Sequence, residues 1–369
     1  MAIEDLRIEP VPGASNLTEG LLGLTDIRIA GVVKFQSNKA KPIKSLKLLL
    51  IGAAETALRL NAGDHTLFSD KRVFLTKTAD SLAGVVSESD GSLAVKVGEN
   101  ECTFEFALSK EECADFPGTV EYVLGDNSGE GASKGDLVSV QYSIAVQIET
   151  MGGFLSSPKK LQFSEIIDLP QYNIPNLVRS QQTDTTVFIS GVEPPLEHRV
   201  TVSRGIFSLG QNIHFVVHGV HSLDRAVVVK SLICRIRQDT TITAKERSKK
   251  ISTYVATAAG KFYQEAAAKS NEEMGGRVVW KGEGAGKIDF THKKQSKGML
   301  SGTAVIDALG SVNVMDGFFE IHHFAELCVG LKDGRELKFT TPVVFEAVDV
   351  ETKEWLILNA AKLARGPEE

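Results

Sequence analysis

Apolar residues that recur at every second position are the feature that most constrains how this chain can fold. Across residues 138–148 every even-numbered position is apolar, whereas the odd positions are small or polar. The same alternation runs through residues 27–35, 102–108 and 319–329. A period of two places one set of side chains on a core and the other in water, as in a half-buried β-strand. Many such strands without interleaved helices predict an all-β fold of antiparallel β-sandwiches.

The length of the chain predicts two domains. At 369 residues the chain is too long for one ordinary domain and fits two of roughly 150–200 residues. Prolines occur in residues 169–175 and again in residues 191–195, which indicates a boundary. We therefore expect two tandem immunoglobulin-like β-sandwiches over residues 1–190 and 191–369, with residues 185–190 as the last strand of the first sandwich.

Three segments depart from the alternating pattern. Residues 260–274 are rich in helix formers, and Glu265 and Lys269 place opposite charges four positions apart. This composition is typical of a natural helical insertion and equally of a designed spacer, and both interpretations stay open. Residues 352–365 fit either a terminal helix or an extended arm. The glycine-rich residues 282–287 predict a flexible hairpin loop.

The composition excludes several classes of protein. Lys and Arg total 41 against 47 Asp and Glu, and the net charge of −6 argues against a dedicated nucleic-acid binder. No apolar run approaches the ~20 residues of a membrane-spanning helix. The 4 cysteines are far apart and form no disulfide framework, which favours a reducing compartment. We expect a soluble cytoplasmic protein.

No catalytic, metal or cofactor signature is recognisable in the sequence. On a strand, His214 and His218 lie about 13 Å apart, too far to share one ion. Residues 126–136 lack the order of a calcium loop and are predicted to be a disordered connection. His323 falls in the apolar series of its strand, which predicts a hydrogen-bonded core histidine, and Cys102 falls in such a series as well. The sequence therefore predicts a protein without enzymatic activity, metal or cofactor.

Two groups of basic residues stand out in the second half of a chain that is acidic overall. Their members are Lys245, Arg247, Lys249 and Lys250 in one short polar segment and Lys293, Lys294 and Lys297 in another. Facing hairpin ends would gather them into one patch that attracts acidic or phosphorylated tails through charge-assisted hydrogen bonds. Such a patch would also attract anionic lipid. Solvated lysines on loops are the alternative.

The order of the strand phrases resembles the arrestin superfamily. In the first half, the phrases that resemble the arrestin N-terminal domain are residues 31–35 (GVVKF), 43–52, 102–108 and 118–124, followed by the alternating strand from Val138. In the second half, the phrases that resemble the arrestin C-terminal domain are residues 200–213, 226–238, 319–329 and 338–345. The resemblance extends from about residue 27 to residue 348 and is greatest to the fungal α-arrestins, the arrestin-related trafficking adaptors.

The resemblance implies a function in membrane trafficking. It implies a non-enzymatic adaptor that binds cytosolic tails of transporters or receptors, links them to ubiquitination and endocytosis, and is recruited to the plasma membrane or endosomes. It also implies that basic surface of the second domain binds acidic motifs. Many α-arrestins recruit a ubiquitin ligase through Pro-Pro-x-Tyr, but after Pro194 and Pro195 this chain has Glu197 in place of the tyrosine. Either a ligase binds a tail outside this chain, or this member recruits no such ligase directly. The alternative is a structural subunit of a retromer-like sorting coat, because retromer contains an arrestin-fold component.

Overall fold

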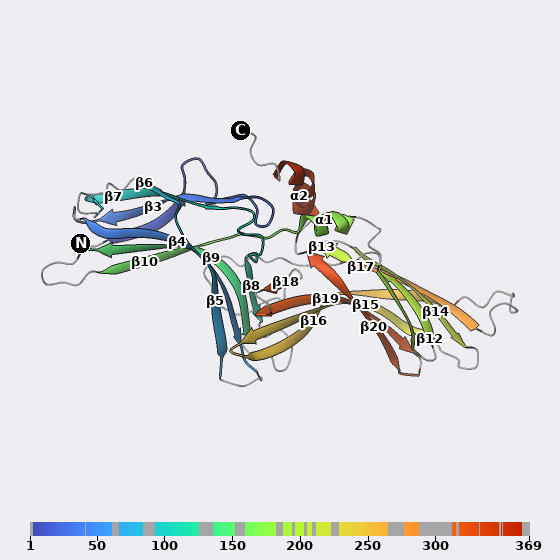
Figure 1. The fold of residues 1–369 in the computed structure, drawn as a ribbon. Coiled ribbons are helices and arrows are strands. Elements are labelled where there is room, and N and C mark those ends of the chain that lie inside the picture. Colours follow the sequence, from blue (N-terminus) through green and yellow to red (C-terminus); the bar gives the residue numbers. More distant parts are fainter. Residues whose placement is uncertain are drawn as a thin grey trace.

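Antiparallel β-sheets make up most of the described chain, and Figure 1 shows them in an elongated molecule. Two five-stranded sheets lie at one end of the molecule and a ten-stranded sheet lies at the other, so the all-β prediction is confirmed. The computed structural model describes residues 3–363 apart from 41, 61–65, 84–92, 125–135, 152–158, 182–186, 194–195, 203–204, 209–211, 223–228, 265–276, 288–311, 315–316, 332, 347 and 349.

The N-terminal part of the molecule, residues 3–167, contains the two five-stranded sheets. The first has the strand order β1-β3-β7-β6 with β2 beside β3, and the second has the order β10-β9-β4-β5 with β8 beside β9. The strands of the first sheet are β1 (Ile3–Pro10), β2 (Thr18–Glu19), β3 (Ile27–Ser37), β6 (Ser81–Ala83) and β7 (Gly98–Leu108). Those of the second are β4 (Ile43–Leu58), β5 (Phe68–Thr78), β8 (Val120–Leu124), β9 (Asp136–Thr150) and β10 (Lys160–Ile167).

The C-terminal part, residues 187–346, forms the ten-stranded sheet. Its order is β11-β12-β14-β17-β16-β15-β19-β20-β13, with β18 beside β19, and only β13 and β20 pair in parallel among the described strands. The strands are β11 (Val187–Glu193), β12 (Leu196–Val202), β13 (Ile206–Ser208), β14 (Asn212–Ser222), β15 (Val229–Ala244), β16 (Arg247–Gln264), β17 (Arg277–Lys287), β18 (Val312–Val314), β19 (Phe319–Leu331) and β20 (Glu336–Glu346). In the described chain, no strand pair joins this sheet to the N-terminal part.

Two helices lie side by side near the middle of the molecule (Figure 1). Helix α1 (Ile174–Gln181) follows the N-terminal part, and helix α2 (Val350–Leu363) follows β20. Leu177 of α1 and Leu356 of α2 are buried in one small apolar cluster. The segment for which the sequence left a helix or an extended arm open is therefore a helix over most of its length.

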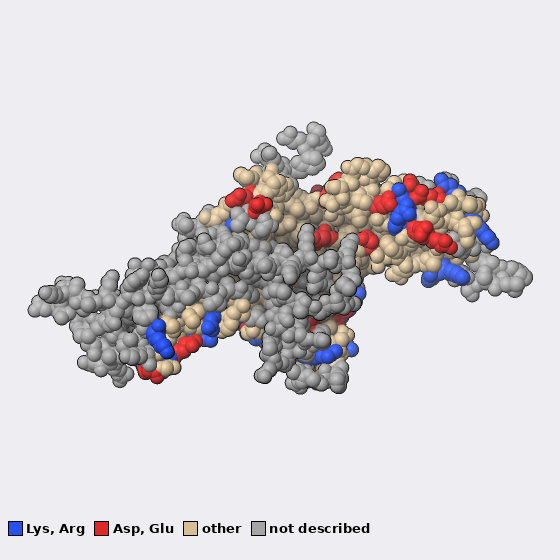
Figure 2. All heavy atoms as spheres, turned by 180° about the vertical axis from the view of Figure 1, so that it is seen from behind, with Lys and Arg blue, Asp and Glu red and all other residues tan. Residues whose placement is uncertain are grey.

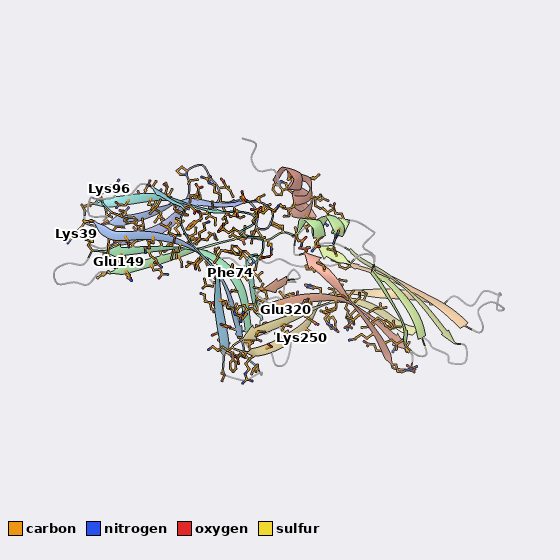
Figure 3. All side chains as sticks on the ribbon, viewed as in Figure 1. Lys39, Phe74, Lys96, Glu149, Lys250 and Glu320 are labelled. Carbon is orange, nitrogen blue, oxygen red and sulfur yellow. The ribbon has the colours of Figure 1, made fainter. Side chains whose placement is uncertain are left out.

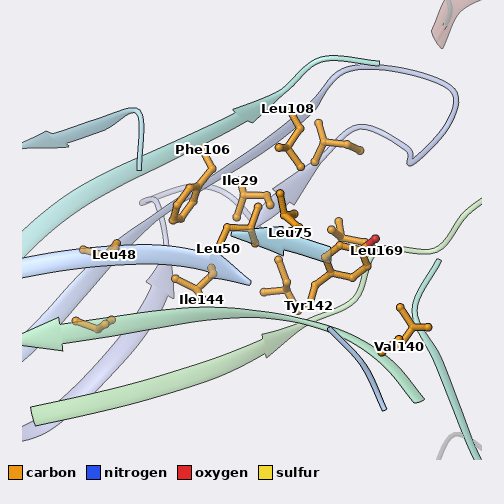
Figure 4. Packing of buried hydrophobic residues seen from close by; sticks show 14 of the residues in the cluster. Ile29, Leu48, Leu50, Leu75, Phe106, Leu108, Val140, Tyr142, Ile144 and Leu169 are labelled. Carbon is orange, nitrogen blue, oxygen red and sulfur yellow. The ribbon is translucent and has the colours of Figure 1, made fainter. Parts of the chain in front are cut away.

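The core of the N-terminal part shows why the alternating residues form sheets. Val140, Tyr142 and Ile144 of β9 are fully buried, whereas the residues between them are more exposed. In Figure 4 these side chains lie in the same packed interior as Ile29 of β3 and Phe106 of β7, which belong to the other sheet. Burial of these alternating apolar faces between the two sheets supplies the main favourable term for folding of this part.

A β-bulge in β5 turns two consecutive side chains toward the interior. Gly52 pairs with Leu75 and Ala53 with Val73, so Phe74 has no partner in the ladder. The Phe74 ring packs edge-on against Tyr142, with ring centroids 5.6 Å apart. A Cβ on Gly52 would lie 2.6 Å from the Phe74 ring, so a larger residue here would displace this ring. Phe74 and Leu75 therefore pack against the core, whereas Val73 is exposed.

Two assignments from the sequence are wrong: the sheet that the strand at residues 185–190 joins, and the hairpin loop at residues 282–287. Residues 185–190 were expected to close the first sandwich, but β11 pairs with β12 in the ten-stranded sheet. Alternation indicates a strand and not the sheet that it joins, and this explains the error. Residues 282–287 were expected to form a hairpin loop, but they are part of β17, which pairs with β14 and β16. Gly282 and Gly284 pair with β14 on one side and with β16 on the other, and this pairing outweighs the low strand propensity of glycine.

The first five residues of the helical insertion expected at residues 260–274 form a strand and not a helix. β16 continues to Gln264. Gly260 pairs with both β15 and β17, and residues 261–264 pair with β17. Residues 265–274 lie outside the described residues, so the choice between a helical insertion and a designed spacer is not tested there.

Candidate binding surface

The first basic group lies at the end of the β15–β16 hairpin. Ala244 pairs with Arg247, which leaves Lys245 and Glu246 as a two-residue turn. Both turn residues have positive φ angles, 47° and 64°, as a type I′ turn requires. Lys245 and Arg247 are exposed, and neither has an ion-pair partner within the residues that the structure describes. We call these two cations the hairpin tip.

Lys249, two residues further along β16, joins the two parts of the molecule. Its Nζ lies 2.5 Å from Asp136 Oδ2 and donates a second hydrogen bond of 2.9 Å to the Arg59 carbonyl oxygen. Asp136 is only 2 % exposed, and its Oδ1 accepts a hydrogen bond of 2.7 Å from the Arg59 amide. Lys249 is therefore held by the N-terminal part of the molecule.

Asp136 corrects the prediction of a disordered connection at its own position. The residue begins β9, and its carboxylate is bound on both oxygens by groups from β16 and from the end of β4. An acidic, glycine-rich stretch gives no sequence signal for a partner more than 100 residues away. Residues 126–135 lie outside the described part of the chain.

Further contacts make the junction of the two parts a continuous packed region. Thr56 Oγ1 donates a hydrogen bond of 2.7 Å to the Thr243 carbonyl oxygen. The Arg72 guanidinium lies over the Phe318 ring, 4.5 Å from its centroid. Apolar residues of the C-terminal part that join the N-terminal core are Ile242, Ala244, Val314, Phe318, Phe319 and Ile321. The two parts therefore share one interior at the junction.

Lys250, the next residue after Lys249, lies on the opposite side of β16 and is 61 % exposed. Its Nζ lies 3.0 Å from Asp239 Oδ2, and Ser252 donates a hydrogen bond of 2.7 Å to Asp239 Oδ1. Although burial acts in the other direction, hydrogen bonds from Ser252 and Lys250 hold the pKa of Asp239 below its ordinary value. Figure 3 places Lys250 near the junction end of the C-terminal part.

The second basic group lies outside the described residues. Lys293, Lys294 and Lys297 fall within residues 288–311, so the expected meeting of the two groups stays a prediction. Within the first group, the structure separates three roles: the hairpin tip is exposed, Lys249 is in the junction, and Lys250 belongs to a sheet face.

The sequence analysis missed a network of charged residues on that sheet face. Glu326 of β19 is fully buried, and its carboxylate lies 3.2 Å from Arg237 Nη1 and 3.2 Å from Lys338 Nζ. Tyr254 donates a further hydrogen bond of 2.8 Å to it. Burial opposes ionisation, but the bonds from Tyr254 and Lys338 lower the pKa of Glu326. Alternation in the sequence could have indicated that these charged residues share one face of the sheet. Arg235, Arg237 and Asp239 alternate along β15 with the buried Cys234, Ile236 and Gln238.

Other candidate residues lie in the core. His323 is 1 % exposed, its Nε2 lies 3.2 Å from Gln238 Oε1, and burial lowers its pKa to about 4. The prediction of a hydrogen-bonded core histidine is confirmed. Cys102 and Cys234 are buried, and desolvation raises their pKa values to about 11 and about 12. His214 and His218 lie in β14 as predicted, but their side chains are outside the described set.

On the surface of the N-terminal part, cations pair with exposed carboxylates. Figure 2 shows its Lys and Arg side chains interleaved with Asp and Glu. Arg7 lies 2.8 Å from Glu9, and Lys34 lies 2.9 Å from the same carboxylate. In the described residues, no three His, Cys, Asp or Glu side chains gather as metal ligands, and no described helix is long and apolar enough to cross a membrane.

Comparison with known proteins gives no further assignment. No protein-family model matches the sequence, and no characterised protein matches it at a significant level. A functional conclusion therefore depends on the residues themselves and on the geometry above.

Proposed function

We propose that this protein is a non-enzymatic adaptor of arrestin type that binds cytosolic segments of membrane proteins. In this proposal it links them to ubiquitination and endocytic trafficking, is cytoplasmic, and is recruited peripherally to the plasma membrane or endosomes. The two halves of the sequence would be the N-terminal and C-terminal sandwiches of such a fold. The arrestin-like order of the strand phrases supports this assignment, because strands β3, β4, β7, β8 and β9 and strands β15, β19 and β20 lie where those phrases fall.

The observation that carries the proposal is the exposed hairpin tip at the junction. Lys245 lies in the tight two-residue turn and Arg247 directly follows it, next to the contacts that join the two parts. Because neither is ion-paired within the described residues, both remain available to an acidic segment of a partner. A partner that reaches the tip from a membrane protein would add further contacts at a high effective concentration.

A binding measurement with charge-reversal variants tests the proposal. Immobilised acidic cytosolic tails of transporters should retain the purified chain at low salt and release it as salt rises. Lys245→Glu combined with Arg247→Glu should weaken retention at least about tenfold, since two charge-assisted contacts become repulsive. Lys47→Glu with Lys110→Glu, which changes two exposed lysines of the N-terminal part, is the matched control. Equal retention of all three proteins would overturn the proposed role of the tip.

The link to ubiquitination is a separate step of the proposal. It places the ligase contact in a tail outside this chain, because Glu197 replaces the tyrosine of the ligase-binding motif. The second basic group, Lys293, Lys294 and Lys297, is proposed to bind acidic cargo or anionic membrane together with the first. Cargo ubiquitination in cells that express this chain alone, or this chain fused to a Pro-Pro-x-Tyr segment, would test the ligase contact, because only the fused chain should support ubiquitination.

A second candidate, a structural subunit of a retromer-like sorting coat, is favoured by one observation. Trp355 and Leu358 of α2 are 53 % and 78 % exposed, and Val178 of α1 is exposed as well. A constitutive partner would cover such an apolar surface. Size-exclusion chromatography of native extract separates the candidates, since a coat subunit elutes in a stable large complex and an adaptor elutes largely as the free chain.

A further inference from the structure

Helix α2 carries apolar side chains on two opposite sides. Leu356 is 1 % exposed and packs in one cluster with Leu177 of α1 and with Val348. On the other side, Trp355 and Leu358 are 53 % and 78 % exposed, and Leu358 is the most exposed large apolar side chain that the structure describes. A helix that is apolar on both sides is typically buried on both sides, which predicts a partner for the outward side of α2.

Two contacts fix which side of α2 faces outward. The Lys353 ammonium is buried and donates a hydrogen bond of 2.9 Å to Ser208 Oγ of β13. One turn further along, Leu356 packs against α1. With 3.6 residues per turn, Trp355 and Leu358 lie on the side of the helix opposite to these contacts. Figure 1 shows α2 at the outside of the molecule beside α1, and the exposure of the two apolar side chains leaves this side accessible.

The outward side of α2 is a line of four positions with an acidic residue at one end and a basic residue at the other. The positions are 351, 355, 358 and 362, and their spacing is that of the a and d positions of a coiled coil. Glu351 is exposed in the first turn of the helix. Trp355 and Leu358 are the two middle positions, and the sequence has Lys362 at the fourth. We call these four residues the outward stripe.

The order of residues in the outward stripe is self-complementary in an antiparallel pair of helices. When Trp355 of one copy lies beside Leu358 of another, the same register places Glu351 of one copy beside Lys362 of the other. The reason is that Glu351 precedes Trp355 by four residues and Lys362 follows Leu358 by four residues. Each contact then occurs twice around the two-fold axis. A parallel pair would place like charges beside each other at both ends, so the sequence favours the antiparallel pair.

We propose that the outward stripe of α2 binds the same stripe of a second copy of this chain in an antiparallel two-helix contact. Burial of Trp355 against Leu358 supplies the attraction, and the two Glu351–Lys362 contacts set the orientation. Two helices of 14 residues bury less than the roughly 800 Å² per partner of a standard interface. We therefore expect a reversible dimer with a dissociation constant in the micromolar range.

This dimer does not depend on the proposed function, but it bears on the second candidate. The exposed apolar side chains of α2 favour a coat subunit, and a second copy would cover them without a further partner. At the dilution of a native extract a micromolar dimer dissociates, so the chain would elute there as the free chain. Anionic lipid fits the outward side less well, because Glu351 and Glu354 are exposed on this helix.

Sedimentation velocity of the purified full chain at increasing concentration tests the proposal. The wild-type chain should shift from monomer to dimer as its concentration rises to about 100 µM. Leu358→Glu should weaken self-association at least about tenfold, because it places a charge in the middle of the contact. Ile166→Glu changes an apolar residue of the N-terminal part that is 56 % exposed, and this control should leave self-association within about twofold. An unchanged midpoint of thermal denaturation at low concentration verifies that each variant is folded.

Exchange of the two end charges tests the antiparallel register. Glu351→Lys brings two lysines together in each contact and Lys362→Glu brings two glutamates together, so each variant alone should self-associate about fivefold more weakly at low salt. An equimolar mixture of the two variants should recover dimers, because every lysine then meets a glutamate of the other variant. The double variant Glu351→Lys/Lys362→Glu should dimerise like the wild-type chain for the same reason.

Three results in sedimentation would each overturn the proposal. They are a wild-type chain that stays monomeric at about 100 µM, a dimer that Leu358→Glu leaves unchanged, and a mixture of the two charge variants that associates no better than either alone. Two further results would assign the outward stripe elsewhere. Binding of phosphatidylserine vesicles by a monomeric wild-type chain, lost in Leu358→Glu, would assign it to a lipid surface. A stable large complex in native extract that is lost in the same variant would assign it to the coat partner.

Discussion

Exposed ion pairs on the N-terminal part and the ion pair at the junction of the two parts use the same kinds of charged groups in different surroundings. Arg7 and Glu99 are 2.9 Å apart, but their side chains are 46 % and 43 % exposed. Lys249 and Asp136 are also in direct contact, but the Asp136 side chain is only 3 % exposed. Exposed pairs are screened by water and salt, whereas a buried carboxylate that loses its partner keeps its desolvation cost. Distance alone therefore does not rank these pairs, and burial of the carboxylate does.

The largest expected effect is that of Lys249→Ala. The change leaves Asp136 buried with the Arg59 amide as its remaining partner among the described residues, and we expect a loss of about 3 kcal/mol in the free energy of unfolding. Urea denaturation measures it. Lys250→Ala is the matched control, because the adjacent lysine is exposed and Asp239 keeps Arg237 and Ser252. A similar midpoint for both variants would contradict the assignment of Lys249 to the junction.

Lys249 and Lys250 also show what the sequence can and cannot predict. Alternation predicts that adjacent residues of a strand face opposite sides, and it predicted the core positions of β9 and of His323. It does not predict that the hairpin end lies against β4 and β9, because this contact is made by residues more than 100 positions apart. The buried Glu326 was missed for a related reason. An acidic residue on the solvent side of an alternating strand is expected to be exposed, and here Arg237, Lys338 and Tyr254 cover it.

The next largest effect expected is a pH dependence of stability that arises from His323 in the C-terminal part. His323 is buried with a pKa lowered to about 4, so the folded chain takes up its proton only at lower pH than the unfolded chain. The unfolded state therefore binds more protons between about pH 6.5 and 4, and stability falls as pH falls through this window, by up to about 3 kcal/mol. His323→Gln should flatten this part of the profile in thermal denaturation. An unchanged slope would show that other groups are responsible.

Below the pH window of His323, the buried carboxylates Asp239 and Glu326 should lose their contribution to the free energy of unfolding. The pKa values of Asp239 and Glu326 are lowered in the folded state, so their stabilisation is complete above their ordinary values and is lost as pH falls through the lowered ones. Glu326→Gln, which retains an oxygen for Tyr254, should cost about 1–2 kcal/mol at neutral pH. It should cost less at pH values where the wild-type carboxyl is protonated. A cost that does not change with pH would contradict an ionised Glu326.

The smallest expected effect is that of Arg7→Ala on the exposed pairs of the N-terminal part. Arg7 contacts Glu9 and Glu99, and all three side chains are well exposed. Water replaces these contacts in the variant, so the urea midpoint should not shift measurably at physiological salt. A shift comparable to that of Lys249→Ala would remove the distinction between the exposed and the buried pairs.

A double-mutant cycle on Lys249 and Asp136 tests the central claim most directly. The cycle combines Lys249→Ala with Asp136→Asn, which retains an oxygen for the Arg59 amide. If the pair joins the two parts of the molecule, the coupling between the two changes should be at least about 1 kcal/mol. A coupling within about 0.5 kcal/mol of zero would contradict it.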